Sequence, residues 1–429
     1  MRTVTSKYIS HPQQFKQQLL TWSQEFREVV YLESNNHHNA YSHYDCVLAV
    51  DAFTSLKTDY FNAFEDLKQY QQTTQDWLFG YLSYELKNDV EVLYSANHDG
   101  LEFPDLYFFQ PKKLFLLKGN ALEIRYLTMC DEEVESDFTA IQLLSYNLKL
   151  TTDSRIDIHQ RISKEKYLEK IKTMLENIHL GAIYEANFCM EFYAENATIH
   201  PLEKFVKLNE ISEAPFSVYF KNNLHYLLCA SPERYLKKVG EQIISQPIKG
   251  TSRRFANLKA DEESKIKLET DPKERSENIM ITDLVRNDLS RTAQKGSVQV
   301  TELCGVYSFL QVHQMISTIT SNLDNQHTGV EVLRTTFPMG SMTGAPKISA
   351  MKIIENLEAT KRGLYSGAVG YFTPEGDFDF NVVIRSILYN QEKKYLSFSV
   401  GSAITSLSEP EKEYEECMLK AKAMFEVLS

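Results

Sequence analysis

The sequence lacks the features that would place it in a membrane, outside the cell or on a nucleic acid. No stretch approaches the roughly 20 apolar residues of a membrane span, and residues 1–7 have no apolar signal core. No run of Lys or Arg offsets the net charge of −12, which disfavours nucleic acids and anionic membranes as partners. We therefore expect a soluble cytoplasmic protein that binds neither.

Cysteine and histidine patterns that would indicate a redox centre or a transition metal are also missing. The six cysteines are scattered without a C-x-x-C pair and predict buried, reduced thiols. The 11 histidines are dispersed, with no H-x-x-x-H spacing, which argues against zinc or iron. A hard cation held by carboxylates stays possible, because such sites leave weak sequence signatures.

No internal repeat, low-complexity tract or Gly/Ser linker divides the 429 residues. This length exceeds the roughly 250–300 residues at which single cores usually stop growing. We place a boundary at residue 150 and expect the portions 1–150 and 151–429 to form one compact unit. The polar, poorly patterned segment 131–155 is expected to be a surface excursion between them.

Helix and strand signals alternate along the chain and predict an α+β fold. Apolar residues recur at helical spacing over 167–178, with Ser163 as the expected cap and Gly181 as the expected stop. Residues 271–274 and 408–411 each start a helix with a cap followed by proline. Hairpin-like spacing of the strand candidates predicts largely antiparallel sheets covered by helices. The strand candidates are 47–50, 107–109, 114–117, 216–220, 226–230, 368–372, 382–388 and 395–400.

Glu277 stands out because it occupies the inward face of the helix that follows Pro272. It shares this face with Ile281 and Leu284, at offsets of four and seven residues. A buried carboxylate needs a base, a backbone donor or a metal as its partner. A structural salt bridge and a functional role therefore both stay open. By contrast, Glu416 and Lys420 have the spacing of an ordinary exposed i,i+4 ion pair.

Lys249 also has unusual surroundings for a lysine. It lies between Pro247-Ile248 and Gly250, whereas a solvated lysine usually has polar neighbours. A lysine nucleophile needs its pKa lowered by desolvation or neighbouring charge, so that the free amine exists. Residues 340–347 superficially resemble a phosphate loop. However, Ala345-Pro346 separate the glycine from the lysine, which favours a tight structural turn near a ligand.

These residues belong to a series of motifs that resembles the chorismate-utilising enzymes. The resemblance covers residues 164–425 densely and the N-terminal portion more thinly. It implies that family's fold, in which two antiparallel sheets pack face to face, helices wrap them and the site lies in a cleft. The matching segments are 231–236, 247–251, 283–289, 337–347, 365–371 and 381–386, with 32–34, 41–45 and 80–84 in the N-terminal portion.

A few positions separate the branches of this family. Anthranilate synthases resemble Pro-Ile-Ala-Gly-Thr at 247–251, whereas aminodeoxychorismate synthases carry the lysine found here as Lys249. Isochorismate and salicylate synthases activate water with a lysine at the position of Glu185, so water is disfavoured as the nucleophile. The sequence is therefore most similar to component I of aminodeoxychorismate synthase. That component converts chorismate and ammonia to 4-amino-4-deoxychorismate for 4-aminobenzoate and folate.

Two positions depart from the family pattern. Glutamine is usual at position 185 in the amine-transferring members, where this chain has Glu185. Gln314 stands where most relatives have histidine, and His313 comes one residue early. In anthranilate synthases that histidine is associated with pyruvate elimination. Its absence fits an enzyme that keeps the enolpyruvyl group.

The resemblance implies a role for each site residue. Glu277 and Glu416 would hold Mg²⁺, which grips the ring carboxylate of chorismate. Arg385 and Tyr365 would bind the enolpyruvyl carboxylate, with Arg385 making a bidentate contact. Further substrate contacts would come from Gly250, Thr251, Gly401 and Lys420.

The resemblance also implies two displacements with a covalent intermediate. Glu233 would protonate the departing 4-hydroxyl while Lys249 attacks C2, and ammonia would then attack C4 and expel the lysine. Glu185 would accept a proton from incoming ammonia. No segment resembles a glutaminase nucleophile elbow, so ammonia is expected from a separate glutamine amidotransferase subunit. Ser34 lies in a segment that resembles the tryptophan-binding segment of the family, although a retained structural pocket without regulation is favoured.

Other functions within and beyond the family are also considered. Anthranilate synthase component I is the nearest rival, and Lys249 argues against it. Isochorismate-type hydration would form product without ammonia. A non-catalytic chorismate- or tryptophan-binding protein would not need to retain Glu233, Lys249 and Arg385 together with both predicted metal ligands.

Overall fold

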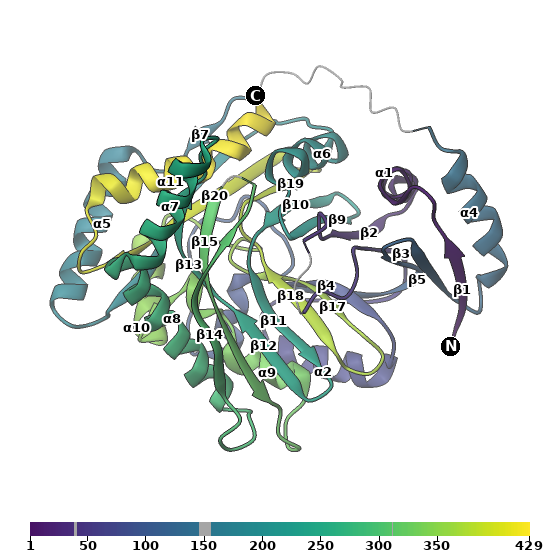
Figure 1. Cartoon of the computed structure of the whole chain (residues 1–429), viewed down its shortest axis with the longest axis horizontal. Coiled ribbons are helices and arrows are strands. Elements are labelled where there is room, and N and C mark those ends of the chain that lie inside the picture. The colour runs from purple at the N-terminus through teal and green to yellow at the C-terminus, as the bar shows by residue number, and fades with distance from the viewer. Residues whose placement is uncertain (38–40, 146–155, 311) are drawn as a thin grey trace.

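A computed structural model describes residues 1–37, 41–145, 156–310 and 312–429 (Figure 1). Its named strands pair in an antiparallel manner throughout and form two branches that meet at the long strand β5 (Leu106–Lys118). Residues 113–118 of β5 pair with β6 (Ala121–Leu127), whereas residues 106–109 pair with β4 (Leu78–Leu82). We call the branch that contains β6 the first sheet and the branch that contains β4 the second sheet.

The first sheet continues from β5 to the strands that carry half of the site. In spatial order it contains β1 (Arg2–Tyr8), β6, β5, β3 (Cys46–Thr58), β2 (Glu28–Glu33), β9 (Phe216–Asn222), β10 (His225–Ser231), β19 (Ser386–Asn390), β20 (Tyr395–Thr405) and β8 (Glu185–Ala194). The short strands β7 (His159–Gln160) and β16 (Gly344–Ala345) pair with β8.

The second sheet ends in three strands, β13 (Ile248–Arg253), β14 (Gln299–Ser308) and β15 (Val312–Asn322), of which β13 carries Lys249. After β4 it contains β17 (Ala368–Phe372), β18 (Phe378–Val382), β11 (Arg234–Val239), β12 (Gln242–Gln246) and β15, and the last of these also pairs with β13 and β14.

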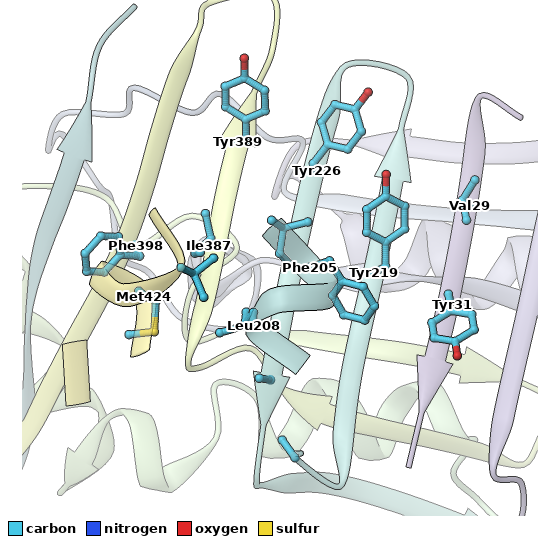
Figure 2. Packing of buried hydrophobic residues seen from close by; sticks show 14 of the residues in the cluster. Val29, Tyr31, Phe205, Leu208, Tyr219, Tyr226, Ile387, Tyr389, Phe398 and Met424 are labelled. Atoms are coloured by element: carbon cyan, nitrogen blue, oxygen red, sulfur yellow. The ribbon is translucent and has the colours of Figure 1, made fainter. Parts of the chain in front are cut away.

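Side chains that alternate along the strands divide between two cores, as a pleated strand requires. Val30 packs in a core that contains side chains of both sheets, and Tyr81 of β4 meets Phe220 of β9 there at 5.3 Å between ring centroids. Val29 and Tyr31 face the opposite core, between the first sheet and its helices (Figure 2). The predicted α+β class with two face-packed antiparallel sheets is confirmed.

Helices cover the outer face of the first sheet and flank the second. Contributors to the outer core are α1 (Pro12–Trp22), α4 (Val134–Leu143), α5 (Lys164–His179), α6 (Pro201–Ser212), α10 (Lys347–Leu357) and α11 (Pro410–Leu428). The helices α2 (Ala63–Thr74) and α9 (Gly329–Thr336) pack on the inner core, α3 (Lys87–Val90) is a single turn, and α7 (Leu258–Thr270) and α8 (Pro272–Ser290) lie beside β13 and β14. None of the helices in the described ranges combines the length and apolar character needed to cross a bilayer.

All three predicted helix starts are confirmed, but the expected side-chain cap is present in only two of them. The Ser163 hydroxyl accepts a hydrogen bond from the amide of Lys166, and Asp271 caps α8 in the same way. The last helix, however, begins at Pro410 without a side-chain cap, because the Ser408 hydroxyl accepts the amide of Thr405 instead.

Three strand or loop predictions also need correction. The run 382–388 is two strands, because Arg385 has a positive φ of 53° and turns the chain between β18 and β19. The runs 107–109 and 114–117 form one strand, since Pro111 sits at a register shift where a missing amide is tolerated. Within 131–155, residues 146–155 lie outside the described residues, and the rest includes α4, which buries Ile141.

The prediction for the six cysteines is confirmed, since all of them are free and buried. The boundary at residue 150 lies outside the described residues and stays a prediction. Strands from both sides of it pair directly, β2 with β9 and β4 with β17.

Candidate active site

One cavity of about 830 Å³ brings together residues that lie far apart in the sequence. Its volume is in the range of small-molecule sites. It opens between β13, the start of α8, the end of β20 and α11. Of the eleven residues predicted to be catalytic, substrate-binding, metal-binding or in a tryptophan pocket, ten line it, namely Glu233, Lys249, Gly250, Thr251, Glu277, Tyr365, Arg385, Gly401, Glu416 and Lys420. Ser34, the eleventh, lies elsewhere.

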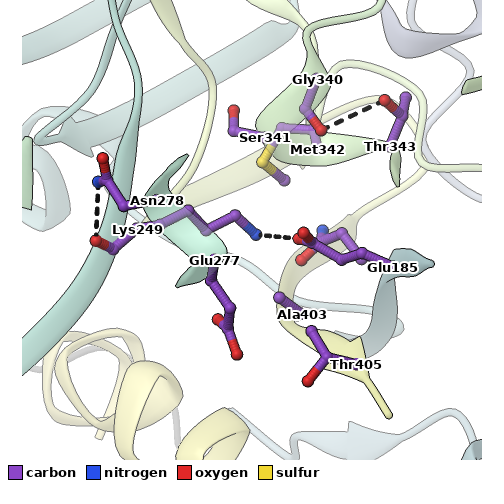
Figure 3. Close-up of polar contacts among 12 residues, drawn as sticks. Glu185, Lys249, Glu277, Asn278, Gly340, Ser341, Met342, Thr343, Ala403 and Thr405 are labelled. Atoms are coloured by element: carbon purple, nitrogen blue, oxygen red, sulfur yellow. Dashed lines mark hydrogen bonds and ion pairs between the residues drawn. The ribbon is translucent and has the colours of Figure 1, made fainter. Parts of the chain in front are cut away.

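Lys249 reaches from β13 across to the first sheet and pairs with Glu185 at the start of β8 (Figure 3). Its Nζ lies 2.8 Å from Glu185 Oε1, and both side chains are buried. Burial by itself lowers the pKa of Lys249, but the charge and hydrogen bond of Glu185 raise it above the ordinary value, with help from Glu277 and Glu233. The lowered pKa expected for a lysine nucleophile is therefore wrong, because carboxylates surround the amine.

Glu233 lies in the turn between β10 and β11 and is almost fully buried. Burial raises the pKa of Glu233 to about 7, although a hydrogen bond from Ser341 and the charge of Lys249 oppose the shift. The Ser341 Oγ donates to Glu233 Oε1 at 2.6 Å. A carboxyl group with this pKa is partly protonated at neutral pH and can donate a proton.

Four glutamates from the first two turns of α8 and of α11 line another part of the cavity wall. Glu274 and Glu277 come from the first turns of α8, and Glu413 and Glu416 come from α11. Only Glu277 and Glu416 were singled out from the sequence. Glu413 lies one turn before Glu416, and Glu274 one turn before Glu277, so helical spacing alone would have found both. Four carboxylates in one wall repel each other unless cations stand between them.

Two lysines supply part of that positive charge. The Nζ of Lys273 lies 3.8 Å from both Glu277 Oε1 and Glu413 Oε1. Lys420 pairs with Glu416 at 2.6 Å, which confirms the expected i,i+4 ion pair, and its Nζ also donates to the Gly401 carbonyl at 2.8 Å. Burial raises the pKa of Glu416, but Lys420 outweighs it and the net shift is downward.

The negative charge of Glu277 is buried and is only partly offset by nearby positive charges. Burial raises its pKa to about 7 despite the opposing charges of Lys249 and Lys273. Its Oε1 is buried and has no hydrogen-bond partner among the described residues. No group of three or more His, Cys, Asp or Glu side chains within those residues is arranged to hold a metal ion. The donor set is nevertheless carboxylate oxygen, which suits a hard cation such as Mg²⁺ that keeps waters and ligand oxygens in its coordination shell.

Arg385 places a positive charge on another part of the wall. Within the described residues, no hydrogen bond or ion pair engages its guanidinium, although Tyr365 and Glu416 act on it electrostatically. Burial lowers its pKa, as expected for a cation that is short of compensating charge. Arg385 and the buried Tyr365 phenol are thus available to an anionic group such as a carboxylate.

Backbone geometry explains the two glycines in the cavity wall. Gly250 has a φ of +99°, and a Cβ there would lie 3.1 Å from Glu274 Oε2. A Cβ at Gly401 would meet Cys189 Sγ at 2.7 Å. The residue after Gly250, Thr251, is exposed and faces Gln314 across the β13–β15 pair.

The two neighbouring residues 313 and 314 separate in space. Gln314 lines the cavity, and its buried Oε1 lacks a partner within the described residues. His313 points away and binds Ser308 and Asp261 at 2.8 and 3.1 Å. His313 therefore does not replace the histidine that most relatives have at position 314.

Ser34 lines a separate, small cavity of about 80 Å³ between β2, β9 and β18. Its hydroxyl is buried and has no hydrogen-bond partner among the described residues. The adjacent Glu33 is neutralised by Lys16 at 2.8 Å. A tryptophan pocket at this place stays a prediction.

Comparisons with known proteins agree on one family. The model of the family described as chorismate binding enzyme matches residues 23–426. Aminodeoxychorismate synthase of Arabidopsis thaliana is 32% identical over 83% of this chain, which spans 41% of that protein's length. Aminodeoxychorismate synthase component 1 of Bacillus subtilis is 28% identical over 87% of this chain and 79% of its own length.

A solved structure supports the fold. The crystal structure of anthranilate synthase component I from Streptococcus pneumoniae superposes with a TM-score of 0.78 over 90% of this chain and 93% of its own. Its sequence identity is 23%. At that identity the superposition establishes a shared architecture and leaves the reaction to be argued from the site.

Proposed function

This chain belongs to the chorismate-binding enzyme family, and from that premise we propose that it catalyses the amination of chorismate to 4-amino-4-deoxychorismate. The observation that carries the proposal is the placement of Lys249. Its side chain lines a cavity that Glu233 and Arg385 also line, with a volume of about 830 Å³. A member that lacked a nucleophilic side chain at this place would have no means of forming a covalent intermediate.

In the proposed reaction, the two carboxylates of chorismate are held by positively charged groups of the site and a bound Mg²⁺. Arg385 and Tyr365 bind the enolpyruvyl carboxylate, and Lys420 and Thr251 add contacts. The lack of a partner for the Arg385 guanidinium among the described residues supports this role, because a buried cation gains most from an anion that desolvates with it. Gly250 and Gly401 line the cavity and would contact the substrate through their backbones.

The bond changes are divided between Glu233 and Lys249. Glu233 donates its proton to the 4-hydroxyl, which leaves as water while Lys249 attacks C2 and the ring double bonds shift. Ammonia then attacks C4, and the C2–nitrogen bond to Lys249 breaks. The raised pKa of Glu233, about 7, supports the role of acid.

Magnesium is part of the proposal. Glu277 and Glu416 would hold the ion, and the Glu277 Oε1, which lacks a hydrogen-bond partner in the described part of the chain, supports this assignment. Glu274 and Glu413, one helical turn away from each, add negative charge that favours a cation. When bound, Mg²⁺ supplies electrostatic stabilisation of the ring carboxylate.

Ammonia is proposed to come from a separate glutamine amidotransferase subunit. The name "component 1" of the Bacillus relative supports the existence of a partner subunit. A cytoplasmic location stays a prediction from the sequence.

Product analysis by mass spectrometry tests the proposal. The protein is incubated with chorismate, Mg²⁺ and high ammonia at mildly alkaline pH, beside a Lys249→Ala variant. We expect aminodeoxychorismate without pyruvate release from the wild type and a loss of at least about a hundredfold in the variant. Anthranilate plus pyruvate would instead assign the chain to tryptophan synthesis. Bound but unconverted chorismate would indicate a non-catalytic binding protein.

A further inference from the structure

Glu185 is placed where it can exchange a proton with Lys249 but not with a reactant in the cavity. Its side chain is 1% exposed, and it is not among the residues that line the cavity. Its Oε1 lies 2.8 Å from Lys249 Nζ. Its Oε2 is buried and has no hydrogen-bond partner among the described residues. The expectation that Glu185 takes a proton from incoming ammonia is therefore not supported by its position.

Lys249 cannot attack while it is an ammonium ion. Three carboxylates act on its charge, Glu185 from β8, Glu233 from the β10–β11 turn and Glu277 from α8. Of these, only Glu185 makes a hydrogen bond to Nζ within the described residues. Because Lys249 is buried, its proton needs an acceptor within reach, and the Glu185 carboxylate is in hydrogen-bond contact with Nζ.

We propose that Glu185 is the catalytic base that removes the proton from Lys249 and later returns it. This inference rests on the proposed function. The proton passes from Nζ to the Glu185 carboxylate, and the neutral amine forms the bond to C2. The C4–O bond breaks, and water leaves with the proton from Glu233. The nitrogen on C2 keeps its two protons as a secondary ammonium.

The second displacement reverses the transfer. Ammonia forms the bond to C4 and keeps its three protons as the product ammonium. The C2–nitrogen bond breaks, its electron pair stays on Lys249, and Glu185 gives the proton back. The Lys249–Glu185 pair thus ends each cycle as it began, and Glu233 regains its proton from solvent.

A change of Glu185 to glutamine separates the contact from the proton transfer. An amide can accept the hydrogen bond of Lys249 but cannot take its proton. The variant Glu185→Gln has nearly the same size and shape as the wild type, so it should fold. It keeps the contact and removes the base.

The proposal predicts a particular pH signature. In the wild type the proton moves within the pair, so the reactive form needs no loss of a proton to solvent. In Glu185→Gln the amine must lose its proton to solvent before chorismate binds. The ratio of variant to wild-type kcat/KM for chorismate should then rise about tenfold per pH unit until the pKa of Lys249 in the variant is reached. At neutral pH the variant should be at least about a hundredfold slower.

The experiment measures kcat/KM for chorismate across pH at a constant concentration of unprotonated ammonia. The matched control is Glu191→Gln, a buried glutamate on the same strand that pairs with Arg161 at 2.9 Å outside the cavity. It should follow the wild-type profile. Lys249→Ala is measured in parallel, and the adduct on Lys249 is sought in Glu185→Gln as chorismate less one water.

The outcomes distinguish failure of this inference from failure of the proposed function. Glu185→Gln that matches the wild type at every pH, while Lys249→Ala is inactive, overturns the role of Glu185 and leaves the proposed function intact. A variant slowed by the same factor at every pH also overturns it, because that pattern indicates only a positioning contact. Full activity of Lys249→Ala would instead overturn the covalent mechanism itself.

Discussion

The Glu233 side chain shows how burial and one hydroxyl set the protonation of a single residue. Burial raises its pKa to about 7, and the hydrogen bond from Ser341 holds it below the value that burial alone would give, because this bond stabilises the carboxylate. An acid catalyst works in its protonated form, so activity should fall as pH rises through this pKa. The pKa of Glu233 therefore sets the upper end of the pH range in which the enzyme is active.

The variant Ser341→Ala tests this balance. Removing the donor destabilises the carboxylate, so the pKa of Glu233 should rise and the basic limb of kcat/KM should move to higher pH. The profile is recorded at constant unprotonated ammonia, with Glu233→Gln as the reference that lacks the acid and should lose about 10²- to 10⁴-fold in rate. A basic limb that stays in place, or moves to lower pH, would contradict the assignment of Glu233 as the acid.

At the scale of elements, a register shift in β13 between Ile248 and Thr251 positions Lys249, and the conformation of the next residue permits it. Gly250 has a φ of +99°, where side chains are disfavoured, and the space for a Cβ is limited by Glu274 and Met315 at 3.1 Å. The variant Gly250→Ala should lose about 1 kcal/mol or more of folding free energy and should also lose activity, because the Lys249 amine would be displaced.

Gly240 provides the matched control for this prediction. It also has a positive φ, +59°, but a Cβ added there would have no atom within 4 Å, and the residue is remote from the cavity. Gly240→Ala should cost stability alone, read as a lower denaturation midpoint with unchanged kcat/KM. Equal activity of the two variants would show that the strain at Gly250 has no bearing on the site.

Local sequence signals predicted the elements where a single short-range cause decides the structure. The Ser163 and Asp271 caps are of this kind, since each hydroxyl or carboxylate binds amides two or three residues on. The break at Arg385 could not be predicted, because nothing in a branched apolar run signals a positive φ. The same break aims Arg385 at the cavity, so the sequence pattern failed at a residue of the candidate site.

The sequence motifs identified individual site residues. They did not predict which residues of different motifs contact each other. The motif around Lys249 identified the residue, but its pairing with Glu185 depends on how the two sheets face each other. That pairing reverses the expected direction of the Lys249 pKa. Glu274 and Glu413 carry no motif of their own. Helical spacing places each one turn before a predicted metal ligand, and the structure adds that α8 and α11 line one cavity.

At the scale of the whole molecule, the N-terminal and C-terminal portions depend on each other for strand pairing. Strand pairing β2–β9 and β4–β17 joins residues 1–145 to residues 156–429 in both sheets. Buried charges also cross this division, since Lys87 Nζ lies 3.5 Å from Glu355 and Ser95 donates to the same carboxylate. Separation would leave two strand edges unpaired and would open the core between the sheets.

We therefore predict that residues 156–429 do not fold alone although they contain the whole candidate active site. Expressed separately, this fragment should aggregate or show no cooperative unfolding, and it should form no aminodeoxychorismate. Co-expression with residues 1–145 should recover a soluble complex with activity, because the β2 and β4 edges are supplied in trans. Near-ultraviolet circular dichroism and thermal denaturation measure the folding, and a fragment that is soluble, cooperative and active by itself would show that the N-terminal portion is dispensable for the fold.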